Sequence, residues 1–170
     1  MKVISGCQVG VDEAGLRAAY DLGIATGGTM PNGWNTQTGP RPDWGIKYGL
    51  VEHVSPKYPP RTRKNVIDSD VTVLFGNMNS SGSKLTIKYC KENDKPYYVV
   101  EFHGYPLDIH DNAIGIVFFL LHKQPNVINI AGNRENSNKG VSEFTYAVLS
   151  EALDDFKRSN KHPMSSLFEH

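Results

Sequence analysis

Two short loops in this chain have the composition of an anion-binding site. The first, Gly6–Asp12, follows a β-branched run, the second, Gly76–Ser83, follows another, and each leads into a predicted helix. Small residues let the backbone approach a ligand, and the free N–H groups of a helix N-terminus favour negative charge. The pattern indicates a phosphate-type site, although glycines that merely form tight turns would look the same. The candidate ligand-binding residues here are Gly6, Cys7, Gln8, Gly10, Asp12, Ser81, Gly82, Ser83 and Thr86.

A third cluster lies on the helix that Pro59-Pro60 is predicted to open. Arg61, Asn65 and Asp68 fall at i, i+4 and i+7, and therefore share one face of that helix. An Asn facing inward beside an Arg requires hydrogen-bonding partners, because burying either group alone is costly. The trio is a second set of candidate ligand-binding residues; its simpler alternative is a solvated surface face.

A fourth cluster, Asn133, Arg134 and Glu135, directly follows the last predicted strand. An arginine at the end of a strand can grip a phosphate or another oxyanion with two parallel hydrogen bonds. The alternative is that Arg134 forms a salt bridge to Glu135 or to the neighbouring helix. These three residues complete the predicted site.

Catalytic and metal-binding patterns are weak. The histidines have no ligand spacing, and neither a Ser-His-Asp order nor a carboxylate pair indicates hydrolysis. Cys7 and Cys90 lie far apart without metal-like neighbours, so we predict no metal site and no disulfide framework. Cys7 precedes a helix N-terminus, where a lowered thiol pKa is plausible; a small buried residue is the simpler interpretation.

The common nucleotide-binding signatures do not match. Gly6-Cys-Gln-Val-Gly10 has the wrong spacing for a dinucleotide fingerprint, and the second strand ends in Ala25-Thr26-Gly27 rather than in an acid. No Gly-Lys-Ser/Thr follows a glycine-rich run, so a Walker loop is absent as well. NAD and ATP are therefore disfavoured as standard ligands.

Strand-like and helix-like segments alternate along the chain. The predicted strands are Val3–Ile4, Ile24–Ala25, Tyr48–Val54, Asp70–Phe75, Lys95–Val100 and Asn126–Ile130. The predicted helices are Asp12–Leu22, Arg61–Ser69, Gly82–Asn93, Ile109–His122 and Gly140–Phe156, although Ile109–His122 is apolar enough to be a strand instead. The order predicts one doubly wound α/β domain over residues 1–158, with a mostly parallel sheet of about six strands, helices on both faces and a flexible tail at 159–170.

The predicted sheet brings the clusters together. Ligands of open parallel sheets bind outside the carboxyl ends of the strands, where the winding reverses. If the first strand and the strand Asp70–Phe75 flank that reversal, the two small-residue loops share one crevice. The irregular segment from Met30 to Trp44 is long enough to be functional, and its tryptophans argue against disorder.

Composition limits the classes of partner. The 170 residues are 39% hydrophobic and 21% charged, with a formal net charge of zero. No overall field attracts nucleic acid or an anionic membrane, and the apolar run Ala113–Leu121 is too short to span a bilayer. With no signal peptide recognisable, we predict a cytoplasmic protein without nucleic-acid or membrane partners.

Several of these segments together resemble the molybdenum-cofactor carrier family. The resemblance covers about Lys2 to Leu153 and rests on Ser5–Asp12, Gly23–Gly28, Pro31–Gly33, Gly39-Pro40, Arg61–Asp70, Ser81–Thr86, Lys95-Pro96 and Asn129–Glu135. That family belongs to a Rossmann-like superfamily, which also includes the lysine-decarboxylase-like phosphoribohydrolases and DNA-processing protein A. The resemblance implies a Rossmann-like fold.

Two motifs of the chain depart from the usual pattern of this family. Gly6-Cys7 stands where the family usually has Gly-Gly, and Ser81-Gly82-Ser83 stands where it has Gly-Gly-Thr. The phosphoribohydrolases continue that second motif to a catalytic glutamate, whereas this chain continues with Leu85-Thr86-Ile87. The missing glutamate favours a binding protein over a hydrolase.

The resemblance implies a carrier for a small anionic ligand, either the molybdenum cofactor (molybdopterin) or a nucleotide, in a homo-oligomer such as a dimer or tetramer. Arg61 and Arg134 would offset the ligand's charge, and Trp34 or Trp44 would cover the pterin ring. One alternative is an enzyme that acts on a nucleotide-derived molecule, such as an N-glycoside hydrolase, with Asp12, Asp68 or Glu135 as its acid. Another is a sensing or oligomerising module that performs no chemistry.

Overall fold

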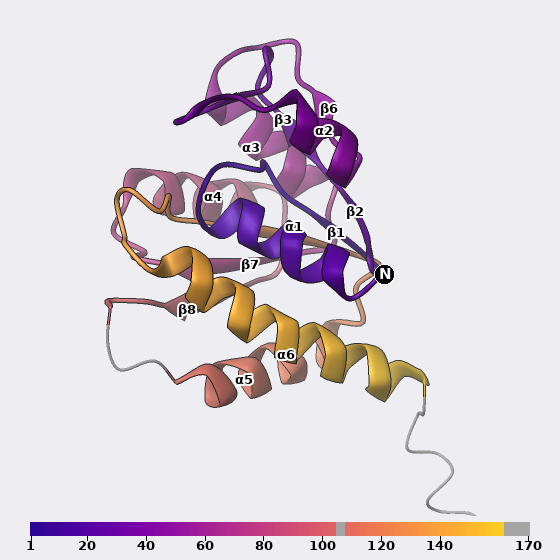
Figure 1. Ribbon diagram of the computed structural model, residues 1–170. Coiled ribbons are helices and arrows are strands. Elements are labelled where there is room, and N and C mark those ends of the chain that lie inside the picture. The colour runs from indigo at the N-terminus through magenta and orange to yellow at the C-terminus, as the bar shows by residue number, and fades with distance from the viewer. Residues whose placement is uncertain (105–107, 162–170) are drawn as a thin grey trace, which may run out of the picture.

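A computed structural model describes residues 1–104 and 108–161 and has the predicted doubly wound, Rossmann-like α/β architecture (Figure 1). The central sheet has five parallel strands in the order β2-β1-β9-β7-β8. Its strands are β1 (Lys2–Ile4), β2 (Ala25–Gly27), β7 (Val71–Gly76), β8 (Tyr97–Glu101) and β9 (Val127–Gly132). The helices are α1 (Val11–Asp21), α2 (Pro42–Tyr48), α3 (Tyr58–Ile67), α4 (Ser81–Glu92), α5 (Ile109–Lys123) and α6 (Val141–Lys161).

The order of the strands places the last strand between the two whose loops are expected to share a crevice. The first strand and β7 do not lie next to each other, because the last strand, β9, pairs with both. Lys2 is in register with Val127, and Val71 is in register with Ile128. Since all three strands are parallel, the loops that follow β1, β9 and β7 leave the same edge of the sheet side by side.

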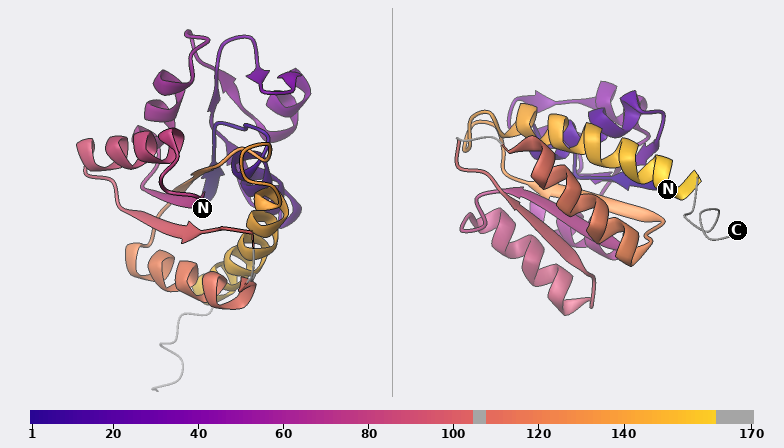
Figure 2. Two further views of the ribbon diagram at one scale, coloured as in Figure 1. Left: turned by 90° about the vertical axis from the view of Figure 1, so that its left-hand side faces the viewer. Right: turned by 90° about the horizontal axis from the view of Figure 1, so that it is seen from below.

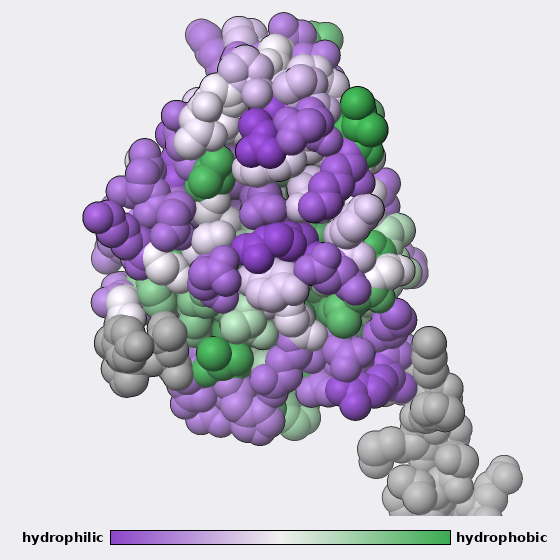
Figure 3. Space-filling model, in the orientation of Figure 1, coloured by the Kyte–Doolittle hydropathy of each residue, from purple (hydrophilic) through white to green (hydrophobic). Residues whose placement is uncertain are grey.

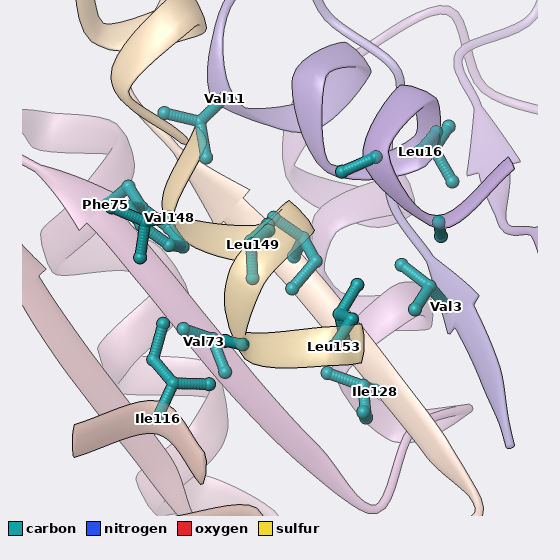
Figure 4. Close-up of a cluster of buried hydrophobic side chains, with 14 of the residues drawn as sticks. Val3, Val11, Leu16, Val73, Phe75, Ile116, Ile128, Val148, Leu149 and Leu153 are labelled. Carbon is teal, nitrogen blue, oxygen red and sulfur yellow. The ribbon is translucent and has the colours of Figure 1, made fainter. Parts of the chain in front are cut away.

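Helices cover both faces of the sheet. Helices α1, α5 and α6 pack together on one face, and α3 and α4 pack together on the other (Figures 1 and 2). Apolar side chains from β1, β7 and β9 meet those of α1, α5 and α6 in the core that Figure 4 shows, with Val3, Val73 and Ile128 opposite Leu149 and Leu153. Every residue of β7 is buried, as is typical of a parallel strand covered on both faces.

The apolar segment Ile109–His122, for which a helix and a strand were both possible, forms helix α5. Its N-cap is Asp108, whose side chain accepts a hydrogen bond from the Asp111 amide at 3.0 Å, so the helical interpretation is confirmed. Ile116 and Leu120 are buried against the core, whereas Phe118 is 70% exposed. The segment is therefore a core helix on one side, and the prediction of a dimer or tetramer stays a prediction.

The segment between β2 and α3 differs from its prediction. Tyr48–Val54 was expected to be a strand of the main sheet, but Tyr48 ends helix α2, and only Val51–Glu52 (β6) is extended. Pro42 suits the first turn of α2, and Gly49 ends that helix in the left-handed conformation with φ 67°. Strand β6 pairs with β3 (Thr29–Met30) in a separate small sheet, and β4 (Asn35–Thr36) pairs with β5 (Gly39–Pro40) in another. The central sheet consequently has five strands rather than six.

The surface and the last helix complete the picture. The face drawn in Figure 3 is mostly hydrophilic, and its hydrophobic areas are small and separate. Among the described residues, none of the helices combines the length and the apolar character that a membrane span requires. Helix α6 continues through residues 159–161, so the first part of the segment predicted as a flexible tail is helical, and residues 162–170 lie outside the described part.

Candidate functional site

The loops after β1 and β9 are joined by their backbones. The amide of Val11 donates to the carbonyl of Asn133 at 3.1 Å, and the amide of Glu135 donates to the carbonyl of Val9 at 3.0 Å. Gly10 forms an isolated antiparallel bridge with Arg134. These contacts fix the β9–α6 loop (residues 133–140) against the start of helix α1.

Gly10 is a glycine because of this junction. Its φ is +136°, which side chains rarely adopt, and an added Cβ would lie 2.5 Å from the carbonyl oxygen of Asn133 and 2.7 Å from the amide nitrogen of Glu135. From the sequence, Gly10 is predicted to allow the close approach of a ligand. In the structure, the backbone that approaches it belongs to the β9–α6 loop.

Asn133 connects the β9–α6 loop to the β7–α4 loop (residues 77–80). Its Oδ1 accepts hydrogen bonds from the amide of Asn77 at 2.5 Å and from Nδ2 of Asn138 at 3.0 Å. Its Nδ2 donates to Oγ of Ser80 at 3.0 Å. With both ends of the amide engaged, Asn133 holds the three loops as one unit.

A cleft with a cavity volume of about 120 Å³ opens where these loops meet α3 and α4. It is lined by Gln8, Asp12, Tyr58, Arg61, Thr62, Gly82, Leu85, Thr86, Ala131, Gly132 and Arg134. An adjoining hollow of about 350 Å³ shares Gly82, Gly132 and Arg134 with it and adds Ser80, Ser81, Asn133, Asn136 and Ser137. Residues of all four predicted clusters therefore line one continuous depression at the carboxyl ends of β1, β7 and β9.

A buried ion pair forms the inner wall of the cleft. Nη1 of Arg61 lies 3.3 Å from Oδ2 of Asp12, and the two residues are only 9% and 5% exposed. Burial raises the pKa of the Asp12 carboxyl above its ordinary value, and the charge of Arg61 opposes that rise. Gly6 lies directly beneath the guanidinium, because an added Cβ would fall 1.4 Å from Nη1 of Arg61. Gly6 thus makes room for an arginine of the protein itself.

Arg134 lines both hollows and is held by an aromatic ring. Its guanidinium carbon lies 4.5 Å from the centroid of Tyr58, and that of Arg61 lies 5.6 Å from the same centroid. Within residues 1–104 and 108–161, Arg134 has no ion pair. The expected alternative, a salt bridge to Glu135, does not form, because the Glu135 carboxylate accepts from the amides of Gly140 at 2.7 Å and Ser142 at 2.9 Å. Glu135 therefore caps helix α6. The Arg134 guanidinium lines the cleft without a carboxylate partner among the described residues.

The N-terminus of α4 contributes two unused donors. Ser80 is its N-cap, and its Oγ accepts from the amide of Ser83 at 3.2 Å. The amides of Ser81 and Gly82 have no hydrogen-bond partner in the described part of the chain. A Cβ added at Gly82 would meet no atom within 4 Å, so the space beside this turn is open. Thr86 donates its hydroxyl back to the carbonyl of Gly82 at 3.0 Å, and Ser83 is buried, so both support the turn from inside.

Cys7 is a buried structural residue. It is fully buried, and burial, together with the nearby charges of Asp12 and Glu13, raises the pKa of its thiol far above the ordinary value. The lowered pKa suggested by its position before a helix is therefore wrong, because the thiol is enclosed by the core. Its φ of 53° lies in the left-handed region, which explains why a glycine would suit this position.

Asn65 and Asp68 do not join Arg61 at the cleft. The Asn65 side chain makes two hydrogen bonds to the backbone of Thr29, donating to its carbonyl at 3.0 Å and accepting from its amide at 2.9 Å. Asn65 thereby fixes α3 to β3. Asp68 ends the helix on the surface, where Nζ of Lys64 lies 2.7 Å from its Oδ2. Of the predicted polar face, Arg61 lines the cleft, Asn65 is buried against β3, and Asp68 faces solvent.

The aromatic residue of the cleft was not predicted. Trp34 and Trp44, which the resemblance implied as the cover of a pterin ring, do not line the cleft. Trp34 packs over Gly45, and the Arg41 guanidinium lies 3.7 Å from the Trp44 ring centroid. Tyr58 lines the cleft instead; its position three residues before Arg61 on a helix was the available signal.

Comparisons with known proteins agree with this fold. The model of the family described as "Circularly permutated YpsA SLOG family" matches residues 3–153. A similar solved structure is the crystal structure of a protein from Syntrophus aciditrophicus SB named "Putative molybdenum carrier protein". It is 32% identical, has a TM-score of 0.81, and is matched over 89% of this chain and 94% of that chain. No curated protein matches the chain. The resemblance inferred from the sequence is confirmed, and the chain belongs to the circularly permutated YpsA SLOG family.

Proposed function

We propose that the protein carries a phosphorylated pterin of the molybdenum-cofactor type, or a related nucleotide-like anion, in the cleft at the carboxyl ends of β1, β7 and β9. The observation that carries the proposal is the set of unused donors at the outer end of the cleft. Arg134 has no acidic partner among the described residues, and the free amides of Ser81 and Gly82 lie beside it. Unpaired cationic and amide donors around an open turn are the features that bind phosphate groups.

The dimensions of the depression and the relative of this chain support the same proposal. The cavity volume of the cleft is about 120 Å³ and that of the adjoining hollow about 350 Å³, and the second value lies within the range of roughly 300–1,000 Å³ that small-molecule sites occupy. The similar protein of Syntrophus aciditrophicus SB bears the name of a molybdenum carrier. A carrier needs a site that binds without reacting, and the catalytic glutamate of the hydrolase relatives has no counterpart after Ser83 in this chain.

The direct test is titration calorimetry with the purified protein. We expect the molybdenum cofactor or a nucleoside monophosphate to bind, and molybdate alone to bind more weakly because it fills only the anion end of the cleft. The absence of binding by all three at millimolar concentration would contradict the proposal. Mass spectrometry of what co-purifies with the protein would identify the natural ligand.

Substitution of Arg134 tests the anion end. Arg134→Gln removes the charge but keeps a side chain that can pack on Tyr58. A hydrogen bond to a charged group contributes about 1.5–3 kcal/mol, so we expect affinity for a phosphorylated ligand to fall roughly 10- to 100-fold. Isothermal titration of both proteins with the same nucleotide gives the ratio.

Arg158→Gln is the matched control for Arg134→Gln. Arg158 lies on the surface of α6, where it pairs with Asp154 and Asp155 and lines neither hollow. Its loss changes the net charge equally, and affinity should stay within about twofold because exposed charges are screened. Equal losses in the two variants would show that Arg134 acts only through the overall charge.

Hydrolysis of a nucleotide-derived N-glycoside is the second candidate function, and one observation favours keeping it. Of the three acids named from the sequence, Asp12 lines the cleft, whereas Asp68 lies on the surface and Glu135 caps α6. A general acid or base must reach the ligand. Incubation with a panel of nucleoside monophosphates, followed by chromatography for released base, separates turnover from simple binding.

A further inference from the structure

The inner end of the cleft contains a glutamine with an unused acceptor. Gln8 is 3% exposed, and its Nε2 donates to the carbonyl of Asn35 at 3.0 Å. Because a carbonyl can only accept, the NH₂ group must face Asn35, and the orientation of the amide is fixed. Oε1 of Gln8 is then turned away from Asn35, and it has no partner among the described residues.

Asp12 supplies a second unused acceptor next to Gln8. Its Oδ2 accepts from Nη1 of Arg61 at 3.3 Å and from the amide of Gln8 at 3.4 Å, which places the two residues side by side. Its Oδ1 makes no hydrogen bond within the described ranges, 1–104 and 108–161. Both residues line the same cleft.

These acceptors give the cleft two chemically different ends. The outer end offers donors, namely Arg134 and the free amides at the start of α4. At the inner end, Nη1 of Arg61 is paired with Asp12, and its buried Nε has no partner among the described residues. A second oxyanion there would still face a carboxylate and an amide oxygen, because Asp12 and Gln8 line the same end. A ligand that suits both ends has an anion on one side and hydrogen-bond donors on the other.

We propose that the Gln8–Asp12 end binds a ring edge with two adjacent nitrogen donors, the 2-amino and N–H groups that pterins and guanine share. The proposal deepens the proposed function and rests on it. Adenine lacks this edge, because a ring nitrogen that only accepts lies next to its amino group. Hypoxanthine keeps the N–H group and lacks the 2-amino group. The ring edge, rather than the phosphate, would then decide which phosphorylated ligands bind.

The test uses GMP, IMP and AMP, because these ligands share their phosphate and sugar. Calorimetry of the unaltered protein should show GMP binding about 10-fold more tightly than IMP, the difference expected of one hydrogen bond to a charged or buried acceptor. AMP should bind no better than IMP. Inorganic pyrophosphate, titrated in parallel, reports on the outer end alone.

Asp12→Asn places an amide NH₂ or oxygen where the carboxylate was, so the preference for GMP over IMP should fall to about twofold or less. Pyrophosphate affinity should change far less than GMP affinity. Asp68→Asn is the matched control, because Asp68 lies outside the cleft, and it should keep the full preference. A thermal melt of each variant checks folding, and the ligand series on the unaltered protein decides the question even if Asp12→Asn does not fold.

The outcomes separate this inference from the proposed function. Equal affinity for GMP, IMP and AMP, together with measurable pyrophosphate binding, would overturn the inference and leave the anion site intact. A preference for GMP that persists unchanged in Asp12→Asn would overturn the assignment of Asp12. If neither the nucleotides nor pyrophosphate bind, the proposed function fails, and the inference fails with it.

Discussion

Gly10→Ala should destabilise the protein by about 3 kcal/mol or more, the sum of a strained φ and an unavoidable clash. At φ +136°, the new methyl group would lie 2.5 Å from the carbonyl oxygen of Asn133, and neither backbone can move without breaking the hydrogen bonds between the two loops. Ligand binding should weaken as well, because Arg134 belongs to the displaced loop. Urea denaturation gives the change in the free energy of unfolding, and calorimetry gives the affinity.

Gly39→Ala separates the two causes. Gly39 also has a positive φ, +103°, but a Cβ added there would meet no atom within 4 Å. Gly39→Ala should therefore lower the free energy of unfolding only by the backbone strain, about 1–3 kcal/mol. It should leave ligand affinity unchanged because Gly39 lies outside the cleft. If Gly10→Ala costs no more than Gly39→Ala, the junction between the loops is looser than its contacts indicate.

The second large effect is expected for Arg61→Met. Methionine has a similar length, but it leaves the Asp12 carboxylate buried without its partner. Removal of one member of a buried ion pair typically costs about 3–5 kcal/mol. Lys64→Met is the matched control on the same helix; its ion pair with Asp68 is exposed, with side-chain exposures of 47% and 42%, and should contribute less than about 1 kcal/mol.

The loss caused by Arg61→Met should depend on pH in a defined direction. Burial already raises the pKa of Asp12 in the folded protein, and removing Arg61 removes the main opposing cause, so the pKa rises further. A folded-state pKa above the unfolded value makes stability fall as pH rises from 3.8, the ordinary pKa of an aspartate, through the raised pKa. The variant should therefore be closest to the unaltered protein near pH 4 and furthest from it at pH 8. A deficit that is constant across this range would show that lost packing, rather than the uncompensated charge, causes the destabilisation.

Arg61 and Gly10 each stabilise the arrangement of the loops, and each also lies in the cleft or next to it. Arg61 crosses Gly6, pairs with Asp12 and contacts the Tyr58 ring, so the ion pair is a part of the scaffold as well as a wall of the cleft. A ligand that binds only the folded protein should then raise its melting temperature with concentration. Thermal shift with GMP or pyrophosphate is a rapid first measurement of this linkage.

Local features of the sequence predicted most of the elements. The run Asp70–Phe75 predicted strand β7, and the structure adds two local signals: Gly23 follows the first helix with φ 67°, and Ser80 caps α4 with its side chain. Such signals are legible because they depend on neighbours within a few residues. The prediction of a strand at Tyr48–Val54 was wrong because it relied on the β-branched residues of that segment. Two other local signals, Pro42 at the start of α2 and Gly49 at its end, were passed over.

Residues that depend on distant partners could not be assigned from the sequence. Gly6 and Gly10 looked like ligand-contacting glycines, yet each makes room for another part of the chain. Asn65 shares a helix face with Arg61 by spacing, but it pairs with Thr29 because strand β3 happens to pass that end of the helix. Tyr58 precedes Arg61 by three residues on a helix, but that spacing alone does not show which face of the helix lines the cleft.

By itself, the sequence determined the alternation of strands and helices, the family, and the four polar clusters, three at strand ends and one on a helix. The tertiary structure alone decided that β9 lies between β1 and β7, which brings Arg134 between the two small-residue loops. Strand order depends on pairing between segments more than a hundred residues apart, such as Lys2 with Val127, and periodicity within one segment does not encode it. The opening loop, Gly6–Asp12, was found from its composition, but its division into packing glycines and a Gln8–Asp12 acceptor pair came from the folded chain.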